Sequence, residues 1–219
     1  WIDRNLWFMC RLITLPNGKT GKKSAIEAGV AAANSDWIVV TDADILPGTE
    51  WLLTIRKAIK TTDAKFLFGP VTHPAPKGVF SSFQALDFYS LIATGIGGAA
   101  MKIPFMANGA NMAFQKSAFL AVGGYQDNAG TSSGDDVFLL HNIVKRFGRS
   151  AADLICTRGA IVSTDPPLNF AAFLQQRIRW ASKGTAYRSF TAIIVAVVVG
   201  MLNLSVLSAM VLIPFTGLW

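Results

Sequence analysis

The chain has 219 residues, of which 52% are hydrophobic and only 15% are charged, and its net charge is +7. Ordinary soluble domains are about 25% charged, so the composition argues against a wholly soluble enzyme and indicates a membrane-embedded part. The positive charge suits anionic partners such as a nucleotide-sugar or a lipid surface, whereas no basic stripe with interleaved aromatic residues supports nucleic-acid binding. The two cysteines are too few for a disulfide framework, which favours a reduced, cytosol-facing environment.

The first predicted unit is a strand, a helix and a second strand. Residues 10–15 (CRLITL) are a plausible strand, and residues 16–18 (PNG) form a turn signal. A basic segment then opens a helix whose apolar residues recur at helical spacing. This order of elements favours a parallel sheet. Lys22 lies at the start of the helix, where its charge and the backbone N–H groups can meet phosphate; a solvated surface lysine is the alternative.

The second strand belongs to residues 37–47, WIVVTDADILP. A short apolar run that ends in polar and turn residues predicts a strand buried on both faces. Asp42 and Asp44 follow it at a spacing of two, so their carboxylates lie on one side of an extended chain. Ligands gather at the carboxyl ends of parallel strands, and two carboxylates there can hold Mg²⁺ or Mn²⁺, which can bridge to a diphosphate. A D-x-D triplet also arises by chance, so other segments must support this prediction.

The middle of the chain alternates predicted helices and strands. Residues 50–60 predict an amphipathic helix, and residues 65–71 predict a strand. Residues 108–114 predict a glycine turn leading into another strand, and residues 150–163 predict a further strand region. Such alternation is typical of an α/β fold.

Residues 79–107 have a less regular pattern. An aromatic-rich helical half runs into several closely spaced glycines and then into the sequence MKIPF. Two interpretations stay open: an interfacial helix lying on a bilayer, and a core helix followed by a loop. His73, in the proline-rich segment just before, is expected to be a surface histidine.

Asp135 and Asp136 follow Gly134 and begin a helical run that ends near Phe147. Acidic residues at a helix N-terminus can be present only because they interact favourably with the helix dipole. Alternatively, a carboxylate close to a metal–diphosphate site could act as a general base and take a proton from an acceptor hydroxyl. His141, one turn later, is expected to be structural.

Residues 169–183 predict a helix that carries Gln176, Arg179 and Trp180 on one face. An amide, a guanidinium and an indole together suit a polyanionic or sugar ligand, because arginine forks to phosphate and tryptophan stacks on a ring. A Q-x-x-R-W string is much rarer by chance than D-x-D. The alternative is a basic amphipathic helix whose tryptophan lies at a membrane surface.

The last segment, from Ser189 to Trp219, contains no charged residue. A helix over residues 191–213 would be about 34 Å long, enough for a hydrocarbon core of about 30 Å. We therefore predict a transmembrane segment at residues 189–219, preceded by a catalytic domain at residues 1–188. Basic residues crowd the N-terminal side of the segment, so the positive-inside rule places that domain in the cytoplasm.

Taken in order, four sequence features resemble the family 2 glycosyltransferases, the inverting GT-A group that includes cellulose, chitin and hyaluronan synthases and many bacterial membrane enzymes. They are GK at residues 21–22, DAD at 42–44, GDD at 134–136 and QRIRW at 176–180 before a membrane span. The resemblance implies a GT-A-like, Rossmann-like mixed sheet with flanking helices, lacking its N-terminal part, plus a C-terminal transmembrane helix. It also implies membrane location, in the bacterial inner (plasma) membrane, with the catalytic domain cytoplasmic.

The resemblance implies roles on the donor side of the site. Asp42 and Asp44 match the D-x-D that binds a UDP- or GDP-sugar through Mg²⁺ or Mn²⁺, with Asp44 as the direct metal ligand. Lys22 occupies the place of a lysine in the nucleotide-binding half.

On the acceptor side, Asp136, paired with Asp135, matches the base that deprotonates the hydroxyl of a saccharide or lipid-linked acceptor. Gln176, Arg179 and Trp180 match the motif that contacts the diphosphate and the acceptor end. Membrane lipid is the remaining expected partner.

The sequence departs from the family pattern at two points. The first βα unit, with the aspartate that holds the nucleobase, is expected before residue 1, which argues against independent activity of these 219 residues. The usual Glu-Asp pair is Gly-Asp-Asp here. Two other functions stay open: a metal-dependent membrane phospho-transferase, which gives Trp180 no special role, and a catalytically incomplete membrane-bound binding subunit.

Overall fold

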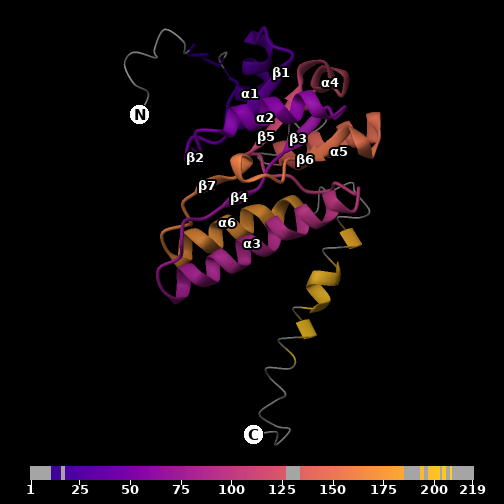
Figure 1. The fold of residues 1–219 in the computed structure, drawn as a ribbon. Coiled ribbons are helices and arrows are strands. Elements are labelled where there is room, and N and C mark those ends of the chain that lie inside the picture. The colour runs from indigo at the N-terminus through magenta and orange to yellow at the C-terminus, as the bar shows by residue number, and fades with distance from the viewer. Residues whose placement is uncertain are drawn as a thin grey trace, which may run out of the picture.

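The structure is a computed structural model that describes residues 11–15, 18–126 and 134–184, and further residues at 193–194, 197–202, 204–205 and 208. Within these ranges the chain forms a mixed α/β fold with two small sheets, and helices cover both faces of the larger one (Figure 1). The mixed sheet with flanking helices agrees with the predicted fold class.

The larger sheet contains both antiparallel and parallel pairs. In the spatial order of its four strands, the first two neighbouring pairs are antiparallel and the last pair is parallel. The chain is therefore not wound as the wholly parallel sheet that the strand–helix–strand pattern favoured. The strand order is β1 (Trp37–Val40), β5 (Met112–Gln115), β3 (Phe66–Phe68) and β6 (Ala152–Leu154).

The smaller sheet continues where two strands of the larger one end. β2 (Ile45–Pro47) follows β1 after the D-x-D segment, and β4 (Val71–Thr72) follows β3. Both flank β7 (Val162–Thr164), β2 in antiparallel and β4 in parallel pairing. The two aspartates of D-x-D thus lie in the connection between the two sheets.

Asn111 ties this junction together. Its side-chain amide donates to the carbonyls of Pro70 and Ala160, at 2.9 and 2.7 Å, and its Oδ1 accepts from Trp51 Nε1 at 3.0 Å. Gly69 lies against it, and a Cβ at that position would stand only 2.5 Å from Asn111 Nδ2. Only a glycine at position 69 therefore leaves room for the buried amide.

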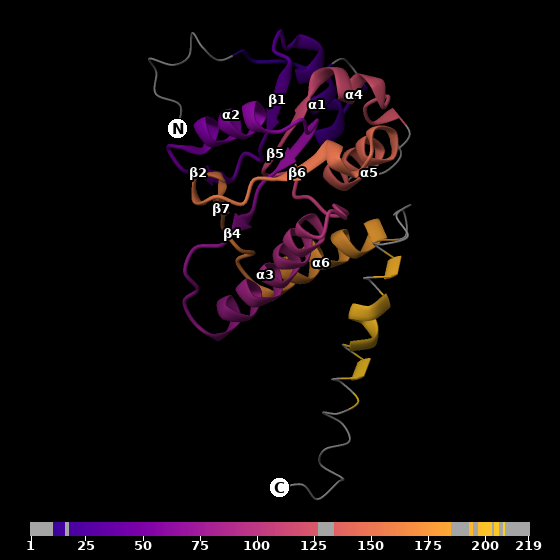
Figure 2. The ribbon, with the colours of Figure 1, turned by 45° about the vertical axis from the view of Figure 1, so that its right-hand side comes forward.

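The helices divide between the two faces of the larger sheet. Figure 2 shows α2 on one side and α1, α4 and α5 on the other. Phe66 and Phe68 of β3 pack into the cluster under α1, α4 and α5, whereas Leu67 between them packs toward α2 and α3, as the alternation of a strand requires. The helices are α1 (Gly21–Ala32), α2 (Trp51–Thr61), α3 (Val79–Ala100), α4 (Lys116–Ala121), α5 (Asp135–Phe147) and α6 (Phe170–Gly184), with short 3₁₀ turns η3 (Arg149–Ala151) and η4 (Arg158–Ala160).

Two strand predictions at the start of the chain are wrong. Residues 11–15 form no strand. β1 is half-buried along its length rather than buried on both faces. The reason is its place at the end of the strand order, where β5 is its one partner within the described ranges. Its apolar residues therefore pack against α1 and α2 without being enclosed.

Two predictions around α3 also need correction. The helix continues through Gly95, Gly97 and Gly98 to Ala100 instead of breaking into a loop. A Cβ on Gly98 would meet the ring of Phe105, so this glycine permits close packing. His73 is not on the surface: it is 8% exposed, because its ring stacks on a phenylalanine of α3 at a centroid distance of 4.2 Å.

In the part of the chain described here, no helix combines the length and the apolar character needed to cross a membrane. Most of the predicted transmembrane segment, residues 189–219, lies outside the described residues.

Candidate active site

Three segments that are far apart in the sequence meet at Lys22. Lys22 is the second residue of α1, Asp42 follows β1, and Asp135 is the first residue of α5. The ammonium Nζ of Lys22 lies 2.5 Å from Asp42 Oδ1 and 3.2 Å from Asp135 Oδ2. It also donates a hydrogen bond of 3.3 Å to the carbonyl of Gly109, in the loop before β5. Lys22 is therefore an ion-pair partner of two predicted site carboxylates.

The loop that contains Gly109 also forms a hydrogen bond with Asp136 of α5. Gly109 N–H donates to Asp136 Oδ2 at 2.9 Å, and Val137 N–H donates to Asp136 Oδ1 at 2.8 Å. A Cβ on Gly109 would stand 3.0 Å from Lys22 Nζ and 3.1 Å from Asp135 Oδ2. Gly109 is thus a part of the site that the sequence argument missed, although a glycine before a predicted strand is the signal that could have revealed it.

The cluster is electrostatically unbalanced. Two carboxylates pair with one ammonium, and Asp136 adds a third negative charge beside them. Burial alone would lower the pKa of Lys22, but the carboxylates of Asp135 and Asp42 outweigh it and raise that pKa above its ordinary value. Lys22 is therefore positively charged at neutral pH, and the surplus of negative charge favours a further cation.

Tyr125 is a buried phenol close to the acid pair. It is 2% exposed, packs edge-on against Phe119 at 5.3 Å, and its hydroxyl has no hydrogen-bond partner within the described residues. Burial, with the negative charges of Asp135 and Asp136, raises its pKa well above the ordinary value. It stays protonated, and the sequence argument assigned it no role.

Asp44 lies on the side of the smaller sheet. Its Oδ2 accepts a hydrogen bond of 3.3 Å from Thr164 Oγ1. The carbonyl of Thr164 is 2.8 Å from His73 Nδ1, and His73 stacks on Phe88 of α3. Asp44 is exposed whereas Asp42 is half-buried, so the two aspartates differ in both partners and burial.

The donor set suits a metal that is shared with a ligand. In the residues that the structure describes, no three His, Cys, Asp or Glu side chains gather into a metal site. Asp42 and Asp44 nevertheless supply hard oxygen donors two residues apart. Mg²⁺ is usually bound by one or two carboxylates together with substrate phosphates and water. The chain's own residues therefore fit a divalent cation completed by a diphosphate.

The Q-x-x-R-W helix packs along α3. Trp180 lies 6.4 Å from Phe88 between ring centroids, and the guanidinium of Arg177 stacks over Trp180 at 4.5 Å. Arg177 also forms an ion pair with Asp87 of α3. The sequence argument did not predict that Arg177 connects α6 to α3 through these two contacts. Gln176 is half-buried and Arg179 is exposed.

A continuous series of contacts joins the D-x-D segment to this helix, running from Asp44 through Thr164, His73 and Phe88 to Trp180. The contacts around Lys22 bring together Asp42, Asp135 and Asp136 through Gly109. Lys22, Asp42, Asp135 and Asp136 therefore form one group, and the contacts from Asp44 to Trp180 form another; residues 42–44 connect the two covalently.

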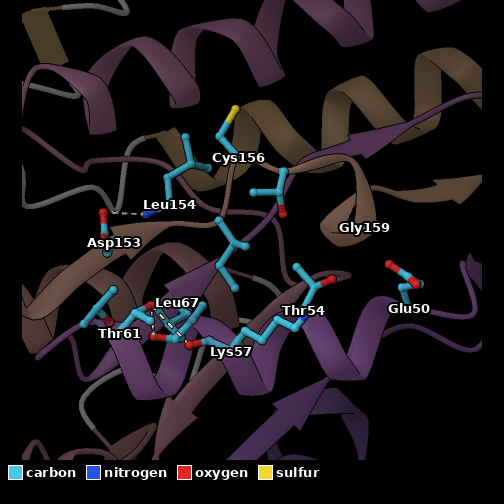
Figure 3. Close-up of a pocket in the computed structure, with 13 residues that line it drawn as sticks. Glu50, Thr54, Lys57, Thr61, Leu67, Asp153, Leu154, Cys156 and Gly159 are labelled. Atoms are coloured by element: carbon cyan, nitrogen blue, oxygen red, sulfur yellow. Dashed lines mark hydrogen bonds between the residues drawn. The ribbon is translucent and has the colours of Figure 1, made fainter.

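A hollow of about 450 Å³ lies elsewhere, between α2 and the segment from β6 to η4 (Figure 3). Lys57, Asp153 and Cys156 are among the residues that line it. It contains none of the predicted site residues.

Residues 37–219 match the family model described as glycosyl transferase family group 2. The match includes D-x-D, the acid pair and Q-x-x-R-W, and begins after Lys22. The chain therefore belongs to this glycosyltransferase family. No curated protein matches it.

Solved structures of glucosyl-3-phosphoglycerate synthase from Mycobacterium tuberculosis are similar to the chain. The complex with phosphoglyceric acid is 15% identical with a TM-score of 0.47, covering 77% of this chain and 54% of that one. The complex with Mn²⁺, UDP and glucosyl-3-phosphoglycerate is 16% identical, with the same TM-score and coverages. A further mycobacterial protein is 18% identical with a TM-score of 0.43, covering 72% and 48%. The chain thus spans about half the length of these proteins.

Proposed function

We propose that the chain is part of an inverting glycosyltransferase. It would move a sugar from a UDP- or GDP-sugar to a saccharide or lipid-linked acceptor at the cytoplasmic face of a membrane, in bacteria the inner membrane. The observation that carries the proposal is the meeting of Lys22, Asp42 and the pair Asp135–Asp136 from three separate segments. Membership of the glycosyltransferase family supports the same reading of Asp42 and of the pair Asp135–Asp136.

The proposed base is Asp136. Two backbone N–H groups, from Gly109 and Val137, fix the orientation of its carboxylate. In that position it takes the proton of the acceptor hydroxyl while the acceptor oxygen bonds to the anomeric carbon. The bond from that carbon to the diphosphate breaks on the opposite face, and the electron pair leaves with the diphosphate. Inversion at the anomeric carbon follows from this geometry.

The leaving diphosphate needs positive charge around it. Lys22 would supply one positive charge from within the cluster, and Arg179, which is exposed on α6, would supply another. When bound at Asp42 and Asp44, Mg²⁺ or Mn²⁺ would supply further positive charge to the diphosphate. Asp135, which is 6% exposed and paired with Lys22, serves to position the lysine.

The experiment is a transfer assay on the complete protein that contains these residues, with labelled UDP- and GDP-sugars and a membrane extract as acceptor source. We expect transfer from one donor, lost with EDTA and restored by Mn²⁺ or Mg²⁺. Release of labelled phosphate without transfer of sugar would instead favour a phospho-transferase. Binding of the nucleotide-sugar without turnover of any donor would favour a binding subunit. Either result would contradict the proposal.

A further inference from the structure

Three oxygen atoms surround the ammonium of Lys22. They are Asp42 Oδ1 at 2.5 Å, Asp135 Oδ2 at 3.2 Å and the carbonyl of Gly109 at 3.3 Å. A lysine ammonium has three N–H groups, so these three oxygens, all from described residues, already match its capacity. For Lys22 to donate to a diphosphate, one of the three has to give up its place.

The three oxygens differ in how open they are to solvent. The side chain of Asp42 is 40% exposed, whereas that of Asp135 is 8% exposed. The loop of Gly109 is held in place from α5, because Asp136 accepts the N–H of Gly109. Withdrawing the ammonium from Asp135 would leave a buried carboxylate without its ion pair, which costs more than withdrawing it from a half-exposed one. Asp42 is therefore the partner that Lys22 can exchange.

Asp42 is also one of the two aspartates that fit a divalent cation. Its ion pair with Lys22 engages one carboxylate oxygen and offsets the negative charge. Affinity for a divalent cation depends on the charge of its ligands. A cation bound at the same carboxylate would also lie close to the ammonium, and the two like charges repel each other. Lys22 thus competes with a divalent cation for Asp42 as long as no phosphate is present.

A diphosphate would remove this conflict. Its negative charges offset the repulsion between the ammonium and a divalent cation, and its oxygens replace the carboxylate that Lys22 gives up. Mg²⁺ is usually bound by one or two carboxylates together with substrate phosphates. Asp42 then turns to the cation, while the contacts with Asp135 and Gly109 keep Lys22 in place.

We propose that Lys22 makes the D-x-D segment selective for a divalent cation that binds together with a nucleoside diphosphate, over the cation alone. In the free protein Lys22 holds Asp42, and in the complex it donates to the diphosphate instead. By linkage, the nucleotide strengthens the binding of the cation, and the cation strengthens the binding of the nucleotide by the same factor. This role of Lys22 rests on the proposed function, which supplies the identity of the two ligands.

The first test measures binding of Mn²⁺ to the complete protein without nucleotide, from the electron paramagnetic resonance signal of the free ion. Lys22→Gln removes the charge but keeps N–H donors at the site. Lys19→Met is the control, because it removes the same charge from an exposed lysine just before the same helix. We expect Lys22→Gln to bind Mn²⁺ about 10-fold more tightly than the parent, and Lys19→Met to stay within about twofold of it.

The second test leaves Lys22 in place and therefore does not depend on the folding of a Lys22 variant. Asp42→Asn and Asp44→Asn each remove one negative charge from D-x-D, but only Asp42→Asn releases the ammonium of Lys22. Binding of UDP and GDP is measured in EDTA, so that no divalent cation takes part. We expect Asp42→Asn to bind the preferred nucleotide several-fold more tightly than Asp44→Asn.

Equal affinities for Mn²⁺ in the parent and Lys22→Gln would overturn the inference, and so would an equal gain in Lys22→Gln and Lys19→Met, which would be a general effect of charge. Equal binding of the nucleotide to Asp42→Asn and Asp44→Asn would overturn it as well. The proposed function survives these results where Asp42→Asn weakens the binding of Mn²⁺ in the presence of the nucleotide. Undiminished binding of Mn²⁺ to Asp42→Asn under those conditions would contradict both the inference and the proposed metal site.

Discussion

The ammonium of Lys22 lies 2.5 Å from the carboxylate of Asp42, although the two residues belong to different elements of the fold. The same ammonium is 3.2 Å from Asp135, which is almost fully buried. One cation at the start of α1 thereby joins the D-x-D segment to the start of α5. Lys22 holds the two acidic segments together, in addition to its proposed role of carrying charge for a phosphate.

Replacement of Lys22 should therefore lower the stability of the fold. In Lys22→Met the buried carboxylate of Asp135 loses its ion-pair partner, and since Lys22 is partly exposed we expect a loss of about 1–2 kcal/mol in the free energy of unfolding. Lys19→Met removes an exposed lysine just before the same helix and should have little effect. Urea unfolding of both variants measures the difference. Equal stability of the two would show that the pair with Asp135 is not formed.

Gly109→Ala should impair transfer with little effect on folding. The added Cβ would stand 3.0 Å from Lys22 Nζ and 3.1 Å from Asp135 Oδ2, so both groups must shift. Small displacements of catalytic groups can lower rates by about 100-fold. Gly48→Ala is the control, because nothing lies within 4 Å of a Cβ there. If both variants retain the parent kcat, Gly109 does not shape the site.

His141 should make stability depend on pH in the mildly acidic range. Burial lowers the pKa of His141, and this outweighs the hydrogen bond to Phe105 and the charge of Asp136, which raise it. The folded state therefore keeps His141 neutral, while the unfolded state takes up a proton as the pH falls below 6.5. We expect the free energy of unfolding to fall between pH 7 and about pH 5.5, and to fall less in His141→Gln. The same pH dependence in both proteins would contradict this assignment.

Arg177 and Asp87 should be energetically coupled across the interface between α3 and α6. They form an ion pair, and Arg177 also stacks on Trp180. In a double-mutant cycle with Asp87→Asn and Arg177→Gln we expect a coupling free energy of about 0.5–2 kcal/mol. Additive effects of the two changes would mean that the helices are held by apolar contacts alone.

The sequence predicted the long amphipathic helices well. α2, α5 and α6 begin and end within one or two residues of expectation, because their apolar spacing is a local property. The pairing of the strands was harder to predict from the sequence, because β1 pairs antiparallel with β5, about 75 residues away along the chain. The burial of His73 likewise depends on Phe88 and Thr164, which no local pattern reveals.

The charged residues of the site were easier to predict than its uncharged ones. Lys22, Asp42 and the acid pair stand at the ends of predicted elements, which made each of them a candidate, but the ion pairs of Lys22 with Asp42 and Asp135 were not predicted. Gly109 and Tyr125 matter only through contacts with distant residues, and neither carries a charge at neutral pH. Arg177 was one of several basic residues on its helix until packing against α3 distinguished it.

The central claim is that Asp136 is the base for sugar transfer, and Asp136→Asn tests it most directly because the amide keeps the shape but cannot accept the proton. Transfer and nucleotide-sugar binding should be measured together in the complete protein, with the exposed Asp63→Asn as control. We predict that transfer falls by about 100-fold or more in Asp136→Asn while donor affinity is unchanged. Transfer at the parent rate in Asp136→Asn would contradict the account.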